Sequence, residues 1–296
     1  MLWIIGAGGM LGKELCRQCK DNKLNFVGTD IDVDITSIEA IQAFMEKQNE
    51  PIEWIINCSA YTAVDKAEEE EEKAYAVNAV GVGNIAKAAS GSGAKVLHIS
   101  TDYVFPGNVN RELVEDDDTG PVGAYGRTKL EGERLLQEYC KEHIIVRTAW
   151  LYGRYGKNFV YTMVNAMNNR DVVRVINDQH GSPTNAVDLA DAILEIVEKA
   201  GKIGIQDPWG IYHFSGMGEC TWYEFAKDIY MIGRNVGVIL SDCKVIPCTT
   251  AEYPTPACRP AFSLLSKKKI IETFGVAIPD WKQSLQKFFK SYIPLQ

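Results

Sequence analysis

Short apolar runs alternate with longer segments of helical apolar periodicity along the first half of the chain. Bounded apolar runs are typical of buried strands, and apolar residues three and four apart are typical of helices. The pattern predicts strands over 2–5, 26–29, 54–57, 95–100 and 144–147, and helices over 11–19, 37–48, 67–89 and 125–142. Such alternation predicts an α/β fold with a parallel sheet between helices, whose strands share one carboxyl edge where ligands bind.

The pattern loosens after residue 147. A polar loop over 177–184 precedes the remaining predicted elements: a helix over 186–199, a strand over 211–215, a helix over 221–231 and a terminal helix ending near Tyr292. We expect residues 1–150 to form the domain that carries the sheet, with about residues 185–215 returning to it. Residues 151–296 should then form mainly a smaller mixed α/β domain over the sheet edge, built to bind a substrate.

Closely spaced glycines follow the first strand. Gly6, Gly9 and Gly12 stand three residues apart, at the junction between a strand and a helix. Such a junction brings bare backbone N–H groups and a helix N-terminus towards a phosphate. The spacing differs from the commoner two-then-three fingerprint, but the strand-to-helix context is the one that a dinucleotide needs. We therefore expect a Rossmann-type, doubly wound sheet that binds NADH or NADPH.

An acidic residue ends the second strand. Asp30 lies about eighteen residues beyond the last glycine, where a ribose-binding carboxylate is expected. Asp30 and Asp32 have no Arg or Lys beside them in the sequence and would repel a 2′-phosphate, which favours NADH. Because a basic residue from elsewhere in the chain could still reach the site, both coenzymes remain open.

The stretch from Ser100 to Lys129 carries the candidate catalytic groups. An apolar strand ends at Ser100 and Thr101, and the next helix places Tyr125 and Lys129 one turn apart on the same face. A phenol with an ordinary pKa of about 10 exchanges protons poorly at neutral pH unless a cation lies beside it. Lys129 could be that cation, and Thr101 could hold the oxygen of a carbonyl that receives a hydride. Taken alone, a packed tyrosine and a solvated lysine would be the commoner arrangement.

Composition narrows the class of protein further. The chain has 296 residues, 46% of them hydrophobic, and a net charge of −8. This charge argues against nucleic acid or an anionic membrane as a partner. No apolar run approaches the roughly 18 residues of a membrane helix, and the first strand leaves no room for a signal peptide. We therefore expect a cytoplasmic protein.

Neither the cysteines nor the acidic residues predict a metal site. The eight cysteines and four histidines lack paired metal-ligand spacing, and Cys16 and Cys19 form an isolated C-x-x-C within a predicted helix. The acidic run over 68–72 is expected to face water near the start of a long helix, where it meets the positive end of the helix dipole.

Taken together, these segments resemble the extended short-chain dehydrogenase/reductases, and within them the dTDP-4-dehydrorhamnose reductase family. The longest matching segments are Gly-Ala-Gly-Gly-Met-Leu-Gly at 6–12, Ser-Thr-Asp-Tyr-Val-Phe-Pro-Gly at 100–107, Tyr-Gly-Arg-Thr-Lys at 125–129 and Asn-Asp-Gln-His-Gly-Ser-Pro-Thr at 177–184. Further matches lie at 57–68, 147–150 and 259–260. The combination is quite specific to this group.

The resemblance implies NADPH- or NADH-dependent reduction of the C4 ketone of dTDP-4-dehydro-L-rhamnose, a nucleotide sugar. Tyr125 would protonate the C4 oxygen, Lys129 would lower the pKa of Tyr125 and bind the nicotinamide ribose, and Thr101 would hold the carbonyl. Other cofactor contacts are implied for Gly6, Gly9, Met10, Leu11, Gly12, Asp30, Asp34, Ile35, Ser59, Ala60, Tyr61 and Ser100. Substrate contacts are implied for Val64, Asp102, Tyr103, Trp150 and Arg259.

The resemblance leaves alternatives open. Related dehydratases carry Asp then Glu after the active-site Thr, whereas Asp102 and Tyr103 follow Thr101 here, which favours simple reduction. Another nucleotide-sugar reductase or epimerase remains open, as does a non-catalytic regulatory subunit like the relative that partners a methionine adenosyltransferase. The presence of Thr101, Tyr125 and Lys129 together argues against the silent subunit. Members of the group are monomers or homodimers, and some use a Mg²⁺ ion that cannot be placed on particular residues here.

Overall fold

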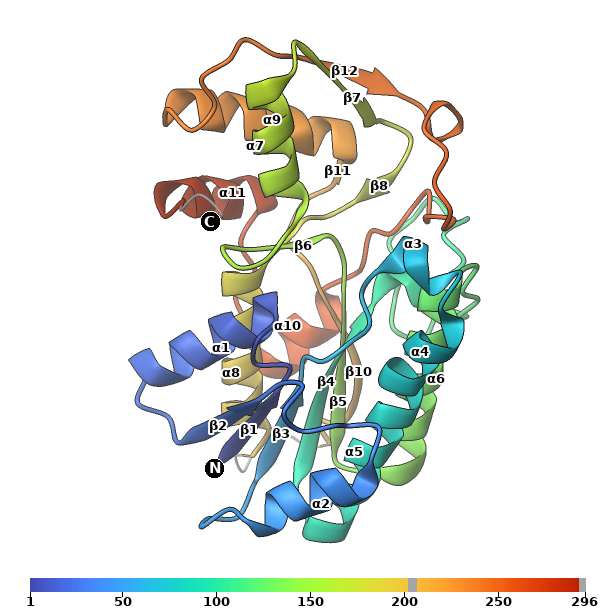
Figure 1. Cartoon of the computed structure of the whole chain (residues 1–296), viewed down its shortest axis with the longest axis vertical. Coiled ribbons are helices and arrows are strands. Elements are labelled where there is room, and N and C mark those ends of the chain that lie inside the picture. Colours follow the sequence, from blue (N-terminus) through green and yellow to red (C-terminus); the bar gives the residue numbers. More distant parts are fainter. Residues whose placement is uncertain (202–206, 293–296) are drawn as a thin grey trace.

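The structure, a computed structural model, describes residues 1–201 and 207–292 and is centred on one parallel sheet (Figure 1). The sheet order is β2-β1-β3-β4-β5-β10, and each neighbouring pair is parallel. The strands are β1 (Leu2–Ile5), β2 (Phe26–Thr29), β3 (Trp54–Asn57), β4 (Lys95–Thr101), β5 (His143–Thr148) and β10 (Gly210–Phe214). The order reverses at β1, between β2 and β3, and ligands bind at such switch points in doubly wound sheets.

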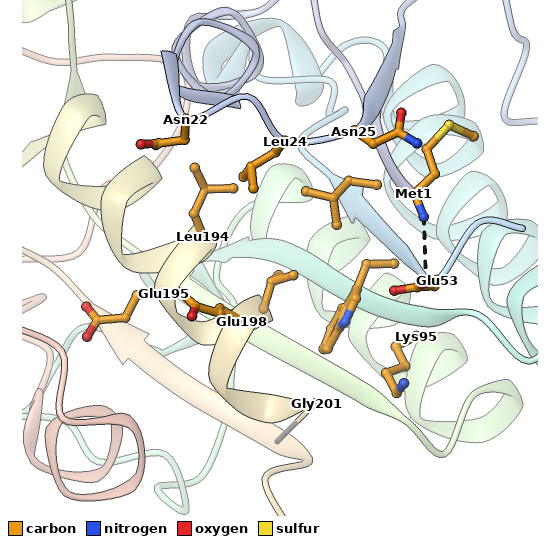
Figure 2. A pocket seen from close by; sticks show the side chains of 13 residues that line it. Met1, Asn22, Leu24, Asn25, Glu53, Lys95, Leu194, Glu195, Glu198 and Gly201 are labelled. Atoms are coloured by element: carbon orange, nitrogen blue, oxygen red, sulfur yellow. Dashed lines mark ion pairs between the residues drawn. The ribbon is translucent and has the colours of Figure 1, made fainter. Parts of the chain in front are cut away.

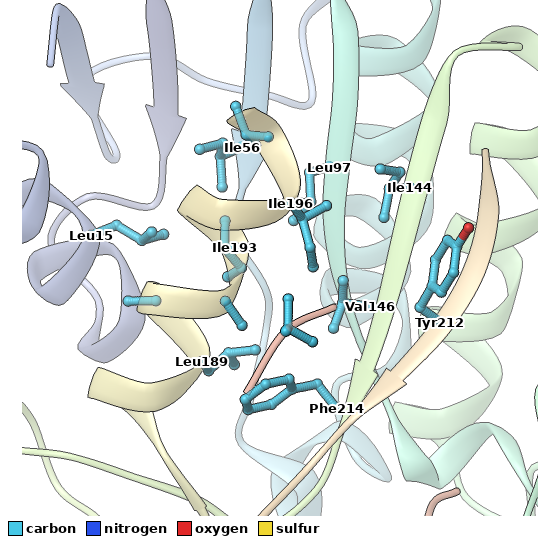
Figure 3. Close-up of a cluster of buried hydrophobic side chains, with 14 of the residues drawn as sticks. Leu15, Ile56, Leu97, Ile144, Val146, Leu189, Ile193, Ile196, Tyr212 and Phe214 are labelled. Atoms are coloured by element: carbon cyan, nitrogen blue, oxygen red, sulfur yellow. The ribbon is translucent and has the colours of Figure 1, made fainter. Parts of the chain in front are cut away.

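Helices cover both faces of the sheet because successive strand residues point in opposite directions. On one face lie α1 (Met10–Asp21), α8 (Ala186–Ala200) and α10 (Lys268–Phe274); on the other lie α2 (Ile38–Glu46), α5 (Gly81–Ser92) and α6 (Ala124–Tyr139). Within β1, Ile4 packs in the first core, whereas Trp3 and Ile5 pack in the second. Figure 3 shows the first core, in which Leu15 and Ile193 lie towards the sheet. Each such side chain contributes roughly 1.5–3 kcal/mol by burial.

The prediction of one continuous helix over 67–89 is wrong. The segment instead forms α3 (Val64–Ala67), α4 (Glu71–Tyr75) and the π-helical turn η1 (Ala76–Val80), which leads into α5. Tertiary contacts interrupt the helix before α4. Glu68 Oε1 accepts a hydrogen bond from the backbone N–H of Ala124 at 2.9 Å, and Glu70 accepts one from the Tyr61 hydroxyl at 2.6 Å. The acidic run is therefore only partly solvated, because it also anchors the start of α6.

Apart from α8, β10 and α10, the elements after β5 form a second layer of structure, at the top of Figure 1. These elements have an apolar core of their own. Its helices are α7 (Phe159–Asn169), α9 (Trp222–Asn235) and α11 (Trp281–Lys290); its strands are β6 (Leu151–Tyr152), β7 (Val172–Ile176), β8 (His180–Gly181), β9 (Thr184–Asn185), β11 (Cys220–Thr221) and β12 (Lys244–Cys248). The turns η2 (Asp102–Val104) and η3 (Thr250–Glu252) complete the fold. The sequence did not predict α7, β7, β12 or α10. Within the described residues, none of the helices is long and apolar enough to cross a membrane.

Candidate active site

A cavity of about 550 Å³ opens at the carboxyl ends of β1, β2 and β3. This is the switch point of the sheet, the position expected for a dinucleotide. Many of the predicted cofactor residues line the cavity: Gly6, Gly9, Asp30, Asp34, Ile35, Ser59, Ala60 and Tyr61.

The glycines keep this cavity open for a ligand. Gly6 has φ of +79°, and a Cβ there would lie 2.7 Å from the backbone nitrogen of Ser59. A Cβ on Gly12 would lie 2.1 Å from the Gly6 carbonyl oxygen, so Gly12 lets α1 approach the loop. Gly9 is the N-cap of α1 and provides no side-chain cap, which leaves N–H groups of the first turn for an anion. These features fit the pyrophosphate of a dinucleotide.

Met10 and Leu11 begin α1 and differ in their surroundings. Met10 is partly exposed at the first helical residue, whereas the side chain of Leu11 is buried in the core beneath the sheet. Leu11 can therefore meet a pyrophosphate only through its backbone N–H group.

The end of the cavity where Asp30 and Asp34 lie is acidic. The Asp30 carboxylate lies against the glycine loop, so that a Cβ on Gly8 would come within 1.9 Å of its Oδ2. Asp34 Oδ1 accepts hydrogen bonds from the N–H and hydroxyl groups of Thr36, and these bonds lower the pKa of Asp34. Among the described residues that line the cavity, none is Lys, Arg or His.

Thr101 and Tyr125 meet at the carboxyl end of β4. The Thr101 side chain lies beside the Tyr125 phenol, donates to Asp102 Oδ1 at 3.0 Å and accepts from the N–H of Tyr103 at 3.3 Å. Tyr125 lies in the first turn of α6, and the ring of Tyr103 stands edge-on to it, with centroids 5.4 Å apart. Burial and then the charge of Asp102 raise the pKa of Tyr125 to about 12. From the sequence we expected Lys129 to lower the pKa of Tyr125. The pKa is instead raised, because burial of the phenol has the largest effect on it.

Lys129 lies one turn further along α6 and is buried, with 1% of its surface exposed. Its Nζ donates to the carbonyl of Ile99 at 2.7 Å and lies 3.0 Å from Nε2 of His98. Burial lowers the pKa of Lys129 to about 8. The amine therefore changes charge close to neutral pH.

Ser100 is not among the residues that line the first cavity. Its hydroxyl donates to the buried carboxylate of Glu133, which also forms a 2.7 Å ion pair with Arg147. This network ties β4 and β5 to α6. The role of Ser100 at the cofactor stays a prediction that its side chain does not support.

Asp102 is the most unusual of the predicted substrate residues. It is 2% exposed, and burial raises its pKa to about 6 although the Thr101 hydroxyl opposes the shift. Ser263 also lies beside this carboxyl, yet no donor among the described residues reaches Oδ2 with hydrogen-bonding geometry. A buried carboxylate oxygen without a partner is costly, which makes Oδ2 a candidate acceptor for a ligand hydroxyl.

Trp150 and Arg259 belong to a second cavity region. Trp150 has φ of +50° and stacks on Trp222, with ring centroids 3.6 Å apart. A neighbouring cavity of about 350 Å³ contains Arg259 in its wall, and Arg259 pairs with Asp65 at 2.8 Å. Asp65 follows Val64 in α3, so this ion pair ties Arg259 to the helix that carries Val64.

Sequence reasoning missed other residues of this region. The second cavity is also lined by Phe159, Arg174, Trp222 and Tyr253. Asn78, in η1, accepts from the N–H of Tyr61 at 2.8 Å and donates to the hydroxyl of Thr128, which fixes the cavity loop against α6. Helical periodicity gave no signal for either group.

No metal centre is evident in the part of the chain that the structure describes. Within residues 1–201 and 207–292, no three His, Cys, Asp or Glu side chains gather where they could hold an ion. A magnesium site remains without residues to place it on.

The chain matches the family model described as the RmlD substrate binding domain over residues 1–293. It belongs to this family. A dTDP-4-dehydrorhamnose reductase from Aggregatibacter actinomycetemcomitans is 40% identical over 96% of this chain and 97% of its own length. The crystal structure of such a reductase from Clostridium acetobutylicum has a TM-score of 0.90 at 40% identity and covers 98% of both chains. One from Bacillus anthracis, solved in complex with NADP, has a TM-score of 0.89 at 36% identity and covers 98% of both.

Proposed function

We propose that the chain is an NAD(P)H-dependent oxidoreductase that reduces the C4 ketone of dTDP-4-dehydro-L-rhamnose to dTDP-L-rhamnose. The observation that carries the proposal is that Thr101 and Tyr125 lie side by side at the carboxyl end of β4, with Lys129 buried one turn further along α6. Family membership with full-length dTDP-4-dehydrorhamnose reductases as relatives supports the substrate.

Tyr125 is the proton donor in this proposal. A reduced nicotinamide in the first cavity would supply the hydride to C4. With a pKa of about 12, the phenol is protonated at neutral pH and can pass its proton to the oxygen that gains charge. Thr101 holds the same oxygen, and the ammonium of Lys129 stabilises the phenolate that remains. General acid catalysis of this kind contributes roughly 10²–10⁴-fold in rate.

The second cavity is the proposed place of the nucleotide. The rings of Phe159 and Trp222 can stack on a base. Arg174 and Arg259, which pair with Glu252 and Asp65, can exchange these carboxylates for the diphosphate. Asp102 Oδ2 would accept a sugar hydroxyl, while Tyr103, Val64 and Trp150 bound the sugar. In this arrangement residues 1–150, with about 185–215, bind the cofactor, and 151–296 bind mainly the substrate.

We propose further that NADH is the preferred coenzyme. Asp30 lies at the glycine loop, and the described lining of the first cavity offers no cation to a 2′-phosphate. Changing Asp30→Asn should improve kcat/KM for NADPH about tenfold relative to NADH, because one repulsive charge is removed. Asp21→Asn, which removes one charge at the end of α1 far from the glycine loop, is the control. An unchanged ratio in Asp30→Asn would refute the role of Asp30.

Thermal protection by different nucleotide sugars tests the proposed substrate. With coenzyme present, dTDP-L-rhamnose should raise the melting temperature more than UDP-glucose or UDP-galactose at equal concentration. Stronger protection by a UDP-sugar would point to another reductase or an epimerase. Binding of coenzyme without protection by any of the sugars would point to the regulatory subunit.

A further inference from the structure

A buried row of polar groups lies behind the candidate catalytic residues. Asn57 at the end of β3 pairs in register with His98 in β4, and Lys129 reaches His98 from α6. Asn57 Nδ2 lies 3.0 Å from His98 Nδ1, and His98 Nε2 lies 3.0 Å from Lys129 Nζ. Asn57 and His98 are both fully buried. Neither residue is needed to hold the sheet together, since the backbones of β3 and β4 already pair.

The hydrogen bonds along this row fix the ring proton of His98. The backbone N–H and the hydroxyl of Ser59 both donate to Asn57 Oδ1, at 3.0 and 2.6 Å. A backbone N–H can only donate, so the carbonyl side of the Asn57 amide faces Ser59 and its NH₂ side faces His98. His98 Nδ1 is then the acceptor. In a neutral ring the single proton therefore sits on Nε2, facing Lys129.

This tautomer is unfavourable for a charged Lys129. An ammonium group has no lone pair and cannot accept from Nε2–H, whereas a neutral amine can. Burial and the nearby lysine hold the pKa of His98 well below its ordinary value, so the ring is neutral. The other titratable groups facing the amine are Glu133 on α6 and Cys58 after β3, and both favour its charged form. His98 opposes them.

We propose that His98, oriented by Asn57, is a positioning residue that holds the amine of Lys129 in place and favours its neutral form during the reaction. This inference rests on the proposed function. After Tyr125 gives its proton to the substrate oxygen, water relays a proton from the Lys129 ammonium to the phenolate: an N–H bond of the ammonium breaks and the O–H bond of Tyr125 re-forms. The electron pair stays on Nζ and accepts the Nε2–H of His98. Water returns a proton to the amine before the next turnover.

The position of the ring proton can be read without any activity. Nitrogen-15 NMR of the histidine ring in the full chain should place the His98 proton on Nε2. Asn57→Asp keeps an acceptor for Ser59 and gives His98 Nδ1 a second carboxylate oxygen, so the proton should move to Nδ1. A wild-type proton on Nδ1 would overturn the proposal, whether or not the chain reduces the proposed sugar.

The pH profile of turnover tests the consequence for Lys129. In Asn57→Asp the unprotonated Nε2 can accept from the ammonium, and in His98→Gln an amide oxygen can do so. Both variants should move the alkaline limb of kcat upward by about one pH unit, with KM for the sugar unchanged. His143→Gln is the control. His143 is also buried but begins β5, at the amino edge of the sheet, so this change should leave the alkaline limb in place. If both variants lowered kcat but left the alkaline limb of its pH profile in place, His98 would have only a structural role and the proposal would be wrong.

Discussion

The two edges of the central sheet differ in a way that cavity size does not reveal. The amino edge holds a cavity of about 700 Å³ between β1, β3 and α8 (Figure 2). It is larger than the cavity proposed for the cofactor at the other edge. Its wall is formed by side chains such as Leu24, Asn25 and Leu194, and the side chain of Glu53, which pairs with the N-terminus, is 74% exposed. The carboxyl edge instead buries Asp102 and Lys129 almost completely.

Burying an ionisable group costs free energy, so the edge of the sheet that buries Asp102 and Lys129 is the one where we expect a ligand to bind. Asp102 and Lys129 both have pKa values shifted towards their neutral forms by burial. Such shifts are typical of catalytic sites. The comparison predicts that changes at the carboxyl edge affect turnover strongly, and that changes at the amino edge affect only stability.

The largest effect is expected at Tyr125. Changing Tyr125→Phe removes the proton donor but keeps the ring against Tyr103, so turnover should fall on the order of 10³-fold. Coenzyme affinity should stay within about twofold. Steady-state rates measure the turnover, and stopped-flow fluorescence measures the coenzyme affinity. Tyr139→Phe, at the far end of α6, should change neither. Persistent turnover in Tyr125→Phe would exclude the assigned mechanism.

A smaller effect is expected at the glycine loop. Gly12→Ala places a methyl group 2.1 Å from the Gly6 carbonyl oxygen, so α1 must move away from the loop. Coenzyme affinity, measured by calorimetry, should fall about 10- to 100-fold. Gly91→Ala in α5 has open space around the new methyl group and should bind as the unchanged chain does. Equal affinity in both variants would remove the loop from the cofactor site.

Changing Asp102→Asn should raise the stability of the fold and lower turnover. The folded pKa of Asp102, about 6, is above the ordinary 3.8, so the native state binds the proton more tightly and loses stability as pH rises from about 4 to 6. Asp102→Asn should therefore raise the free energy of unfolding on the order of 2 kcal/mol at pH 7.5, with no gain at pH 3. Denaturant titrations at the two pH values measure this difference. Turnover should fall, because the variant loses an acceptor for the sugar.

The amino edge should give the smallest functional effect. Leu194→Ala trims a partly buried side chain that packs on the first core, so stability should fall by about 1 kcal/mol. Turnover and coenzyme affinity should remain within about twofold. A loss of either beyond tenfold would mean that the amino edge takes part in function and would break the comparison.

The first half of the chain was predictable because its signals are local. The strands β1, β2 and β3 begin and end where the apolar runs do, and the helical spacing of Tyr125 and Lys129 places them together on α6. These features depend on residues close in sequence, which periodicity reports.

The missed parts depend on contacts between distant residues. β7 pairs with β12, about seventy residues later, and Arg174 in β7 and Lys244 and Pro247 in β12 interrupt the apolar pattern of each strand. The break before α4 comes from Glu68 and Glu70 meeting Ala124 and Tyr61. His98 lies within an apolar run that predicts a buried strand, and only its pairing with Asn57 and Lys129 reveals chemistry. From the sequence, Trp222 is only a residue of a predicted helix. Its stacking on Trp150 is seen only in the structure.

The most direct test of the account follows the absorbance of the reduced coenzyme when the purified chain meets dTDP-4-dehydro-L-rhamnose. NADH and NADPH are supplied in separate reactions, and the sugar product is identified by NMR. The account predicts turnover to dTDP-L-rhamnose with both coenzymes and a higher kcat/KM with NADH. No turnover with either coenzyme, although both bind, would contradict the assignment of a reductase.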